Sequence, residues 1–263
     1  MSEWNASGYQ AVSSLQETMA REQLARVTLG ACDRVLDVGC GNGKITAAIA
    51  DRVPGGSVLG VDPSRNMIDF AREHYGPPTH PNLRFELGDV RNLPYGHEFD
   101  RVVSFNAVHW VPDQAAVLRS IRAALKSDGE ALLRFVPDGP RKCLEDVIED
   151  MCALPQWARY FEARQKPYVH PTPEAYRALA AENGLKVLRL DVEDKAWDFG
   201  SRQAFFDFCH VTFAEWTRFL PEDEWAGFIT QVLDRYQPIT AGDNPPDNNT
   251  FEFYQMEVVL KPV

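Results

Sequence analysis

The chain has 263 residues, with 27 Lys and Arg against 38 Asp and Glu, and a net charge of −11 at neutral pH. Hydrophobic residues make up 44% and charged residues 25%, which is ordinary globular composition and excludes disorder as the main state. A surface this acidic repels phosphate backbones and anionic lipid. We therefore expect neither nucleic acid nor a membrane surface among the partners.

The five cysteines form no CxxC pair and no Cys/His cluster with zinc spacing. An odd number without such spacing disfavours a disulfide framework and a structural metal, and it indicates a reducing compartment. The first residues show no basic patch followed by an apolar run, and no apolar stretch approaches the ~20 residues that span a bilayer. We expect a cytoplasmic protein whose site holds no metal.

Short apolar runs alternate with helical patterns over the first half of the chain. The runs predict strands at 34–38, 57–62, 83–87, 99–105 and 131–136. Helices are expected between them, one capped by Ser64 and one capped by Asp113 and closed by the pair at 128–129. This alternation predicts βαβ units and a parallel sheet with right-handed crossovers.

The regular alternation of strand and helix patterns ends after residue 137. The patterns predict helices near 143–153 and 156–163, a helix opened by Thr172, a strand at 185–191, a helical block over 201–237 and a last strand at 251–260. A helical block between the last two strands predicts a cap inserted over the edge of the same sheet.

The most informative segment is 35–43, which reads VLDVGCGNG and lies where the first strand turns into a helix. Glycines there let the backbone pass close to a ligand, and a helix N-terminus offers unpaired N–H groups. A dinucleotide-binding loop reads G-x-G-x-x-G, but the sixth position here is Lys44. A nicotinamide enzyme is the rival interpretation, and it is disfavoured by Lys44 and by the absence of a recognisable proton-transfer pair.

This segment resembles the first motif of the class I S-adenosylmethionine (AdoMet)-dependent methyltransferases. The resemblance implies a Rossmann-like α/β fold with a seven-stranded, mostly parallel sheet and a helical cap in the C-terminal half. It also implies that AdoMet is bound, with Asp37 near its ammonium, Asp62 on the ribose hydroxyls and Asp89 on the adenine amino group. The full set of cofactor-binding residues that it implies is Tyr9, Asp37, Gly39, Cys40, Gly41, Gly43, Asp62, Pro63, Met67, Asp89, Val90, Asn106 and Ala107.

Three parts of the chain follow from this resemblance. Residues 31–136 are the AdoMet-binding core, and 1–30 are a helical segment that closes over the site. Residues 137–263 hold the helical cap and the last strands of the same sheet. The acidic and glycine-rich features follow successive strands, and ligands of open α/β sheets bind at that edge.

The segments that flank the core indicate the class of the methyl acceptor. Trp4-Asn5 with Tyr9, and the segment 108–113 (VHWVPD), resemble the trans-aconitate methyltransferases. The second segment and 13–16 (SSLQ) also resemble the juvenile hormone acid methyltransferases. Both groups esterify carboxylates of small molecules, so the resemblance implies methyl ester formation, with His109, Trp110 and Gln16 as catalytic residues.

Several alternatives stay open. Trp110 is interpreted as a wall of the site or as packing, and His109 as a carboxylate donor, a general base or a half-exposed structural residue. Nine aromatic residues between 205 and 236 predict a pocket with apolar walls, so we expect an acceptor with an apolar body and a carboxylate. N- or C-methylation of a metabolite, or AdoMet binding without turnover, are the other functions. The sequence does not determine the acceptor, the methylated atom or the oligomeric state.

Overall fold

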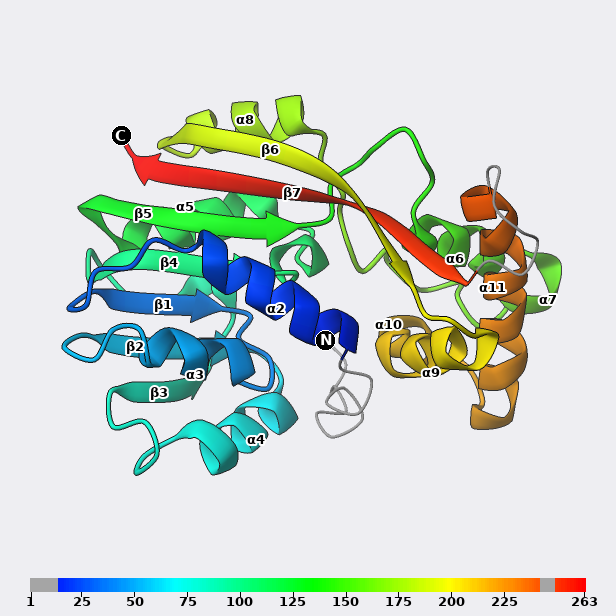
Figure 1. Ribbon diagram of the computed structural model, residues 1–263. Coiled ribbons are helices and arrows are strands. Elements are labelled where there is room, and N and C mark those ends of the chain that lie inside the picture. Colours follow the sequence, from blue (N-terminus) through cyan, green and yellow to red (C-terminus); the bar gives the residue numbers. More distant parts are fainter. Residues whose placement is uncertain (1–13, 242–248) are drawn as a thin grey trace.

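The computed structural model describes residues 14–241 and 249–263 (Figure 1). Its sheet has seven strands in the order β3-β2-β1-β4-β5-β7-β6. The strands are β1 (Arg34–Val38), β2 (Ser57–Asp62), β3 (Leu83–Leu87), β4 (Phe99–Phe105), β5 (Leu125–Phe135), β6 (Leu185–Asp198) and β7 (Thr250–Pro262). Strands β1 to β5 pair in parallel, and β7 runs antiparallel to both β5 and β6. The predicted mostly parallel sheet is confirmed.

Helices cover both faces of this sheet. In Figure 1, α2 and α3 lie in front of the strands and α5 lies behind them. The helices associated with the sheet are α2 (Ser14–Arg26), α3 (Lys44–Ala50), α4 (Arg65–Tyr75), α5 (Gln114–Ala124) and α8 (Pro173–Glu182), with short 3-10 turns η1 (Val90–Asn92) and η2 (Val108–Trp110). Ser64, Asp113 and Thr172 cap α4, α5 and α8, because each side chain accepts a hydrogen bond from a backbone N–H in the first turn.

A cap of further helices lies beyond the carboxyl ends of the parallel strands (Figure 1). It consists of α6 (Leu144–Cys152), α7 (Pro155–Ala158), α9 (Arg202–Thr212), α10 (Ala214–Thr217), η3 (Glu222–Glu224) and α11 (Trp225–Ala241). The cap has its own apolar cluster, which includes Ile148, Trp216 and Phe228 and also takes in Leu15 from α2. Helix α2 therefore packs against both the sheet side and the cap.

Two boundaries predicted from the sequence are wrong, namely the end of α5 and the start of β5. Helix α5 ends at Ala124, and the pair at 128–129 lies inside β5 instead of closing the helix. Leu125 pairs with Phe99, and the pairing then jumps to Arg101 with Glu130, so the intervening residues form an irregularity in the strand. The polar pair at 128–129 is typical of a turn in the sequence. Leu125, however, is buried and pairs with Phe99, so β5 already begins at Leu125.

The last two strands are longer than the sequence predicts. Strand β6 continues to Asp198, beyond the expected end at 191, and pairs with β7 as far as Thr250. Only residues 256–260 of β7 pair with β5. The remaining β6–β7 ribbon leaves the sheet as a two-stranded arm that reaches the cap (Figure 1).

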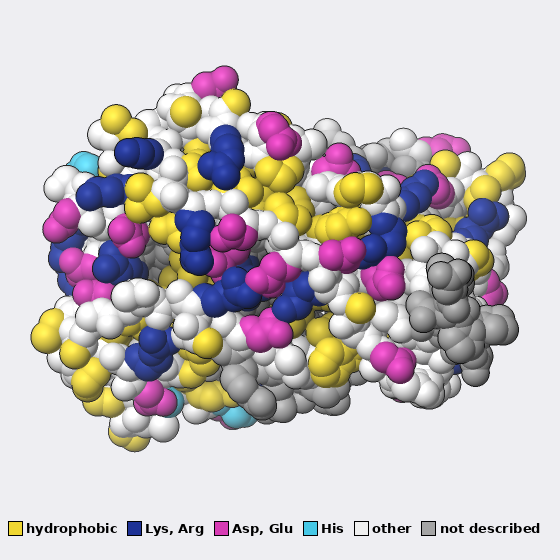
Figure 2. Space-filling view, turned by 45° about the horizontal axis from the view of Figure 1, so that its top comes forward, with side chains coloured by type: hydrophobic (Ala, Val, Ile, Leu, Met, Phe, Trp, Pro, Cys, Tyr) yellow, Lys and Arg dark blue, Asp and Glu magenta, His cyan; other side chains and the backbone are white. Residues whose placement is uncertain are grey.

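Among the described residues, no helix combines the length and the apolar character needed to cross a bilayer. On the face shown in Figure 2, Lys and Arg side chains are interspersed with Asp and Glu. The net negative charge is therefore not gathered in one area of that face.

Candidate functional site

The glycine loop after β1 adopts left-handed backbone conformations. Gly39, Gly41 and Gly43 have φ angles of 73°, 53° and 82°. A Cβ on Gly39 would lie 2.2 Å from the Cβ of Ala107, and one on Gly43 would lie 2.8 Å from the Cβ of Ala71. A Cβ on Gly41 would meet nothing within 4 Å. Packing therefore requires glycine at 39 and 43, whereas at 41 the backbone faces open space where a ligand fits.

Asp62 ends β2 directly beside this loop. Its Oδ2 accepts a hydrogen bond from the Gly41 amide at 3.0 Å, and its Oδ1 accepts one from the Ser64 amide at 2.9 Å. The amides of Gly39 and Cys40 both donate to the carbonyl oxygen of Val61, at 2.8 and 3.1 Å. The end of β2 thus fixes the loop and presents a carboxylate at its rim.

Asp37 lies behind the loop and does not line the cavity described below. It is 2% exposed, and its Oδ2 accepts a hydrogen bond from the Thr46 hydroxyl at 2.7 Å. Burial raises the pKa of Asp37 to about 7, although the Thr46 hydrogen bond lowers it, and the charge of Asp62 raises it further. A cation beside this buried carboxyl would favour its ionised form. The position of Asp37 near the ammonium stays a prediction.

Asp89 begins the turn after β3. Its Oδ1 accepts from the Arg91 amide at 2.9 Å, and the Arg91 guanidinium binds both carboxylate oxygens. The hydrogen bond from Arg91 lowers the pKa of Asp89, so this carboxyl is ionised at neutral pH. Asp89 and the buried Val90 both line the cavity.

Asn106 follows β4 with a φ angle of 54°, which is unusual for a residue with a side chain. Its amide N–H donates to the Arg134 carbonyl oxygen at 2.7 Å, and its Oδ1 accepts from Gln255 Nε2 at 2.6 Å. These contacts hold the turn in which Ala107 packs against Gly39. They impose the left-handed conformation from outside the turn.

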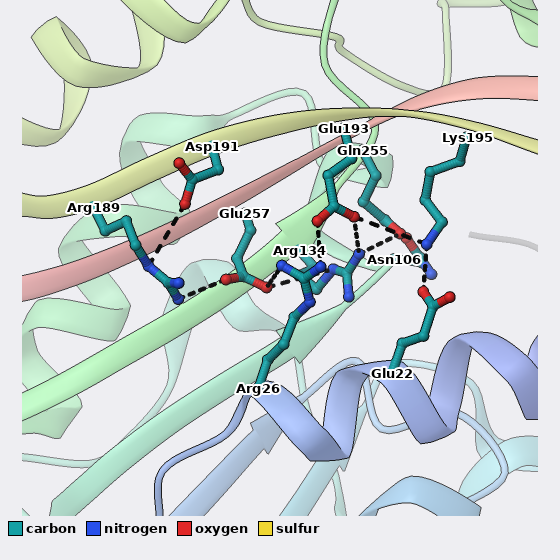
Figure 3. A network of polar contacts seen from close by, with 10 residues as sticks. All are labelled: Glu22, Arg26, Asn106, Arg134, Arg189, Asp191, Glu193, Lys195, Gln255 and Glu257. Carbon is teal, nitrogen blue, oxygen red and sulfur yellow. Dashed lines mark hydrogen bonds and ion pairs between the residues drawn. The ribbon is translucent and has the colours of Figure 1, made fainter.

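Behind Asn106 lies a network of charged side chains that the sequence analysis missed (Figure 3). Arg134, 1% exposed, donates to Gln255 Oε1 at 3.2 Å and to Glu193 at 3.4 Å, and it lies 3.7 Å from Glu257. Arg26 of α2 pairs with Glu193 and Glu257. No sequence signal identified these residues, because they lie on strands and a helix far apart in the chain.

His109 and Trp110 lie in η2, next to each other and to the cap. Their ring centroids are 5.1 Å apart, and Trp110 makes edge contacts with Trp216 at 5.7 Å and Tyr168 at 6.1 Å. His109 is 3% exposed, not half exposed, and its Nδ1 has no hydrogen-bond partner among the described residues. Burial, then the charge of His170, lowers the pKa of His109 well below its usual value. The imidazole is therefore neutral at pH 7.

A cavity of about 700 Å³ runs from the glycine loop to the cap. The predicted site residues that line it are Gly39, Cys40, Gly41, Asp62, Pro63, Met67, Asp89, Val90, Asn106, Ala107, His109 and Trp110. Asp37 and Gly43 lie behind this lining. Tyr9 and the side chain of Gln16 lie outside the described part of the chain, although the backbone of Gln16 belongs to α2.

The cap wall of the cavity is aromatic with several charges. Phe208, Phe213, Trp216 and Phe219 line it, whereas Phe205, Phe228 and Tyr236 are core residues of the cap. Its charged lining residues are Glu145, Arg164, Lys166, Glu215 and Arg218. The predicted pocket with apolar walls thus also carries polar groups that the sequence could not place.

Two of the lining cations have their acidic partners outside the lining. Arg164 pairs with Glu149, and Lys166 pairs with Asp146 at 3.2 Å. Neither acid contributes to the cavity wall. Arg164 and Lys166 thus bring positive charge to the cap wall, beside the carboxylates Glu145 and Glu215 that also line it.

Glu145 belongs to a group of three possible metal donors among the described residues. Donor atoms of Cys143, Glu145 and His170 lie within 4.8 Å of one another. The Cys143 thiol donates to Asp146 at 3.0 Å and lies 3.5 Å from His170 Nδ1. Burial raises the pKa of Glu145, so this carboxyl is a better proton acceptor than an exposed one.

The chain is similar to known methyltransferases. Residues 35–129 match the family described as methyltransferase domain. A putative methyltransferase, 235L, of Invertebrate iridescent virus 6 is 27% identical over 89% of this chain and 85% of the viral protein. The trans-aconitate 2-methyltransferase of Enterobacter sp. (strain 638) is 29% identical over 95% of this chain and 93% of that enzyme. Phosphoethanolamine N-methyltransferase 2 of Haemonchus contortus, solved with S-adenosyl-L-methionine, has the same fold, with a TM-score of 0.64 and 18% identity over 98% of this chain and 57% of that one.

Proposed function

We propose, given that the chain is a class I AdoMet-dependent methyltransferase of small molecules, that its acceptor is a carboxylic acid and its product a methyl ester. The observation that carries this proposal is the pair of cations Arg164 and Lys166 in the cap wall, whose acidic partners lie outside the lining. An aromatic cavity with such cations suits an acid with an apolar body.

The loop has the properties that AdoMet requires. Gly41 leaves open space beside its backbone, and the Asp62 carboxylate at the rim suits a pair of ribose hydroxyls. AdoMet, when bound, supplies an electrophilic methyl group on its sulfonium. We assign Asp62 to the ribose, Asp89 to the adenine side and the turn at 106–107 to the methionine side of the cofactor.

A carboxylate acceptor needs orientation more than it needs a base. It is ionised at neutral pH, so no proton has to leave it before the methyl group is transferred. The neutral His109 and the indole of Trp110 line the cavity beside the turn at 106–107 and can donate hydrogen bonds that orient the acceptor. The aromatic wall excludes water from the reacting groups.

The test uses AdoMet labelled in its methyl group and a panel of small carboxylic acids. Methyl esters hydrolyse in mild alkali, so transferred label should leave as methanol. Label that stays bound through alkali would exclude an ester, and AdoMet binding without consumption across a broad panel would indicate a protein without turnover.

A second candidate function rests on Glu145. This partly exposed carboxyl lines the cavity and has a raised pKa, so it can accept a proton from an amine or hydroxyl acceptor. Glu145→Gln should then abolish one limb of the pH–rate profile. The methylated product of the wild-type protein should be stable in alkali. If esters are formed, the same variant should retain transfer.

A further inference from the structure

A chain of three polar side chains leads from the interior of the sheet to the cavity (Figure 3). Arg134 of β5 donates from Nη2 to Gln255 Oε1 at 3.2 Å, and Gln255 of β7 donates from Nε2 to Asn106 Oδ1 at 2.6 Å. Arg134 and Gln255 are buried, whereas Asn106 is half-buried and lines the cavity. The charged network therefore reaches the cavity wall through Asn106.

The pairing of the strands holds this chain in place. Arg134 lies opposite Glu257 on β7, and Gln255 lies opposite Glu193 on β6. Because alternate residues of a strand share a face, the side chains of Gln255 and Glu257 lie on the same side of the sheet. The guanidinium of Arg134 contacts Gln255 and both acids. The position of Gln255 is thus set by the sheet before any ligand is bound.

The hydrogen bonds of this chain can run in one direction only. A guanidinium has donors and no acceptor, so Gln255 must present its Oε1 to Arg134. The other end of its side-chain amide, Nε2, then faces Asn106, which must present its Oδ1. The remaining polar group of the Asn106 side chain is Nδ2, which is a donor.

Nδ2 of Asn106 is open to the cavity. It makes no hydrogen bond with a described residue, and it is not among the buried side-chain atoms that lack a partner. The methionine side of AdoMet carries a carboxylate, which only accepts hydrogen bonds, and an ammonium, which only donates them. A donor at this point of the wall therefore suits the carboxylate.

We propose that Arg134 and Gln255 are positioning residues for the cofactor. They fix the Asn106 amide with Nδ2 toward the cavity, where it donates to the carboxylate of AdoMet. The proposal rests on the assignment of the turn at 106–107 to the methionine side of AdoMet, and it does not depend on the identity of the methyl acceptor.

The test compares two ligands that differ by one carboxylate. S-adenosylhomocysteine carries this group, whereas its decarboxylated form, S-adenosyl-3-thiopropylamine, keeps only the amine. Gln255→Glu still accepts from Arg134 but presents an acceptor to Asn106, whose amide must then turn its Oδ1 toward the cavity. Measured by calorimetry, this variant should bind S-adenosylhomocysteine about 10- to 100-fold more weakly and the decarboxylated form less than about 3-fold more weakly.

Three further variants complete the test. Gln203→Glu makes the same change at an exposed residue of α9 and should alter neither affinity. Asn106→Asp removes Nδ2 itself and should show the same selective loss as Gln255→Glu. Gln255→Met leaves Asn106 Oδ1 without its donor and should show a smaller loss of the same selectivity, which covers a failure of Gln255→Glu to fold.

Two results would overturn the proposal. Equal losses for both ligands in the Gln255 variants would make Gln255 a structural residue, and unchanged binding of S-adenosylhomocysteine would show that Gln255 does not set the orientation of Asn106. Because no methyl acceptor is present, neither result depends on whether the product of the enzyme is an ester.

Discussion

Asp37 illustrates how function and stability oppose each other at one residue. Its pKa is raised from 3.8 to about 7 because burial disfavours the ionised form. The folded state therefore binds more protons than the unfolded state between these values, and the free energy of unfolding falls as pH rises through that range. Ionised Asp37 thus destabilises the protein at pH 8.

Asp37→Asn should raise the free energy of unfolding at pH 8 by about 2 kcal/mol and weaken AdoMet binding about tenfold. The amide keeps an oxygen that can accept from Thr46 but loses the charge. Urea unfolding and equilibrium dialysis measure the two effects. A variant that binds AdoMet as well as the wild type would make Asp37 purely structural.

Asp62 joins the end of β2 to the loop and to the first turn of α4. Asp62→Ala should weaken AdoMet binding by about 1–3 kcal/mol, because it removes a partner of the ribose hydroxyls and frees the Gly41 amide. Asp62→Asn retains one acceptor oxygen, so its affinity for AdoMet should lie between those of the wild type and the alanine variant. Unchanged affinity in the alanine variant, measured by dialysis, would contradict the assignment of Asp62 to the ribose.

At the scale of elements, the charged network joins α2, β5, β6 and β7 (Figure 3). Removing Arg134 leaves Glu257, which is 2% exposed, with less positive charge around it, and it takes away the donor to Gln255 Oε1. Arg134→Met should therefore lower the free energy of unfolding by about 3 kcal/mol.

The matched control is Arg202→Met, because Arg202 pairs with Asp234 at the surface. It should cost less than about 1 kcal/mol. Urea unfolding compares the two variants. Equal losses in the free energy of unfolding would show that the buried network contributes no more to stability than a surface ion pair.

The β6–β7 arm is fastened to the cap by Tyr236 of α11. Its hydroxyl donates to the Glu252 carbonyl oxygen at 2.7 Å and accepts from the Glu252 amide at 3.0 Å. Tyr236→Phe should cost about 1–3 kcal/mol, because both backbone groups lose their partner.

Tyr176 of α8 provides the comparison. It is also fully buried, but its hydroxyl has no hydrogen-bond partner among the described residues. Tyr176→Phe should leave the free energy of unfolding unchanged or slightly raise it. A larger cost for Tyr176→Phe than for Tyr236→Phe, measured by urea unfolding, would refute this account.

At the scale of the whole molecule, His109 and His170 contribute to the response to acid. Burial lowers the pKa of His170 to about 4 and that of His109 well below 6.5. The unfolded state takes up these protons first, so the free energy of unfolding falls as pH drops below about 6.5. Asp37 acts with the opposite sign over the same range.

Urea unfolding should therefore show a free energy of unfolding that falls between pH 6.5 and pH 5, with each histidine contributing up to about 1.4 kcal/mol per pH unit and the raised carboxyls Asp37 and Glu145 offsetting part of that loss. His170→Gln should lower this slope by up to about 1.4 kcal/mol per pH unit. A slope that persists in this variant would mean that other groups control the acid sensitivity.

The glycine loop, the acidic residues at successive strand ends and the order of strands and helices were readable from the sequence, because they depend on local periodicity and on spacing along the chain. Ser64, Asp113 and Thr172 were likewise identified as caps, since a cap acts within its own first turn. The lengths of β6 and β7 were underestimated, because their outer halves are held by each other and by the cap and not by an apolar pattern of their own.

Only the tertiary structure decided which charges matter. Arg134, Gln255 and Glu257 look like ordinary strand residues in sequence, yet they meet behind Asn106. Arg164 is one of several basic residues after 137, and only the folded cap places it in the wall of the cavity. Local sequence fixes the backbone that receives the cofactor, whereas the recognition of the acceptor depends on burial and on contacts between distant segments.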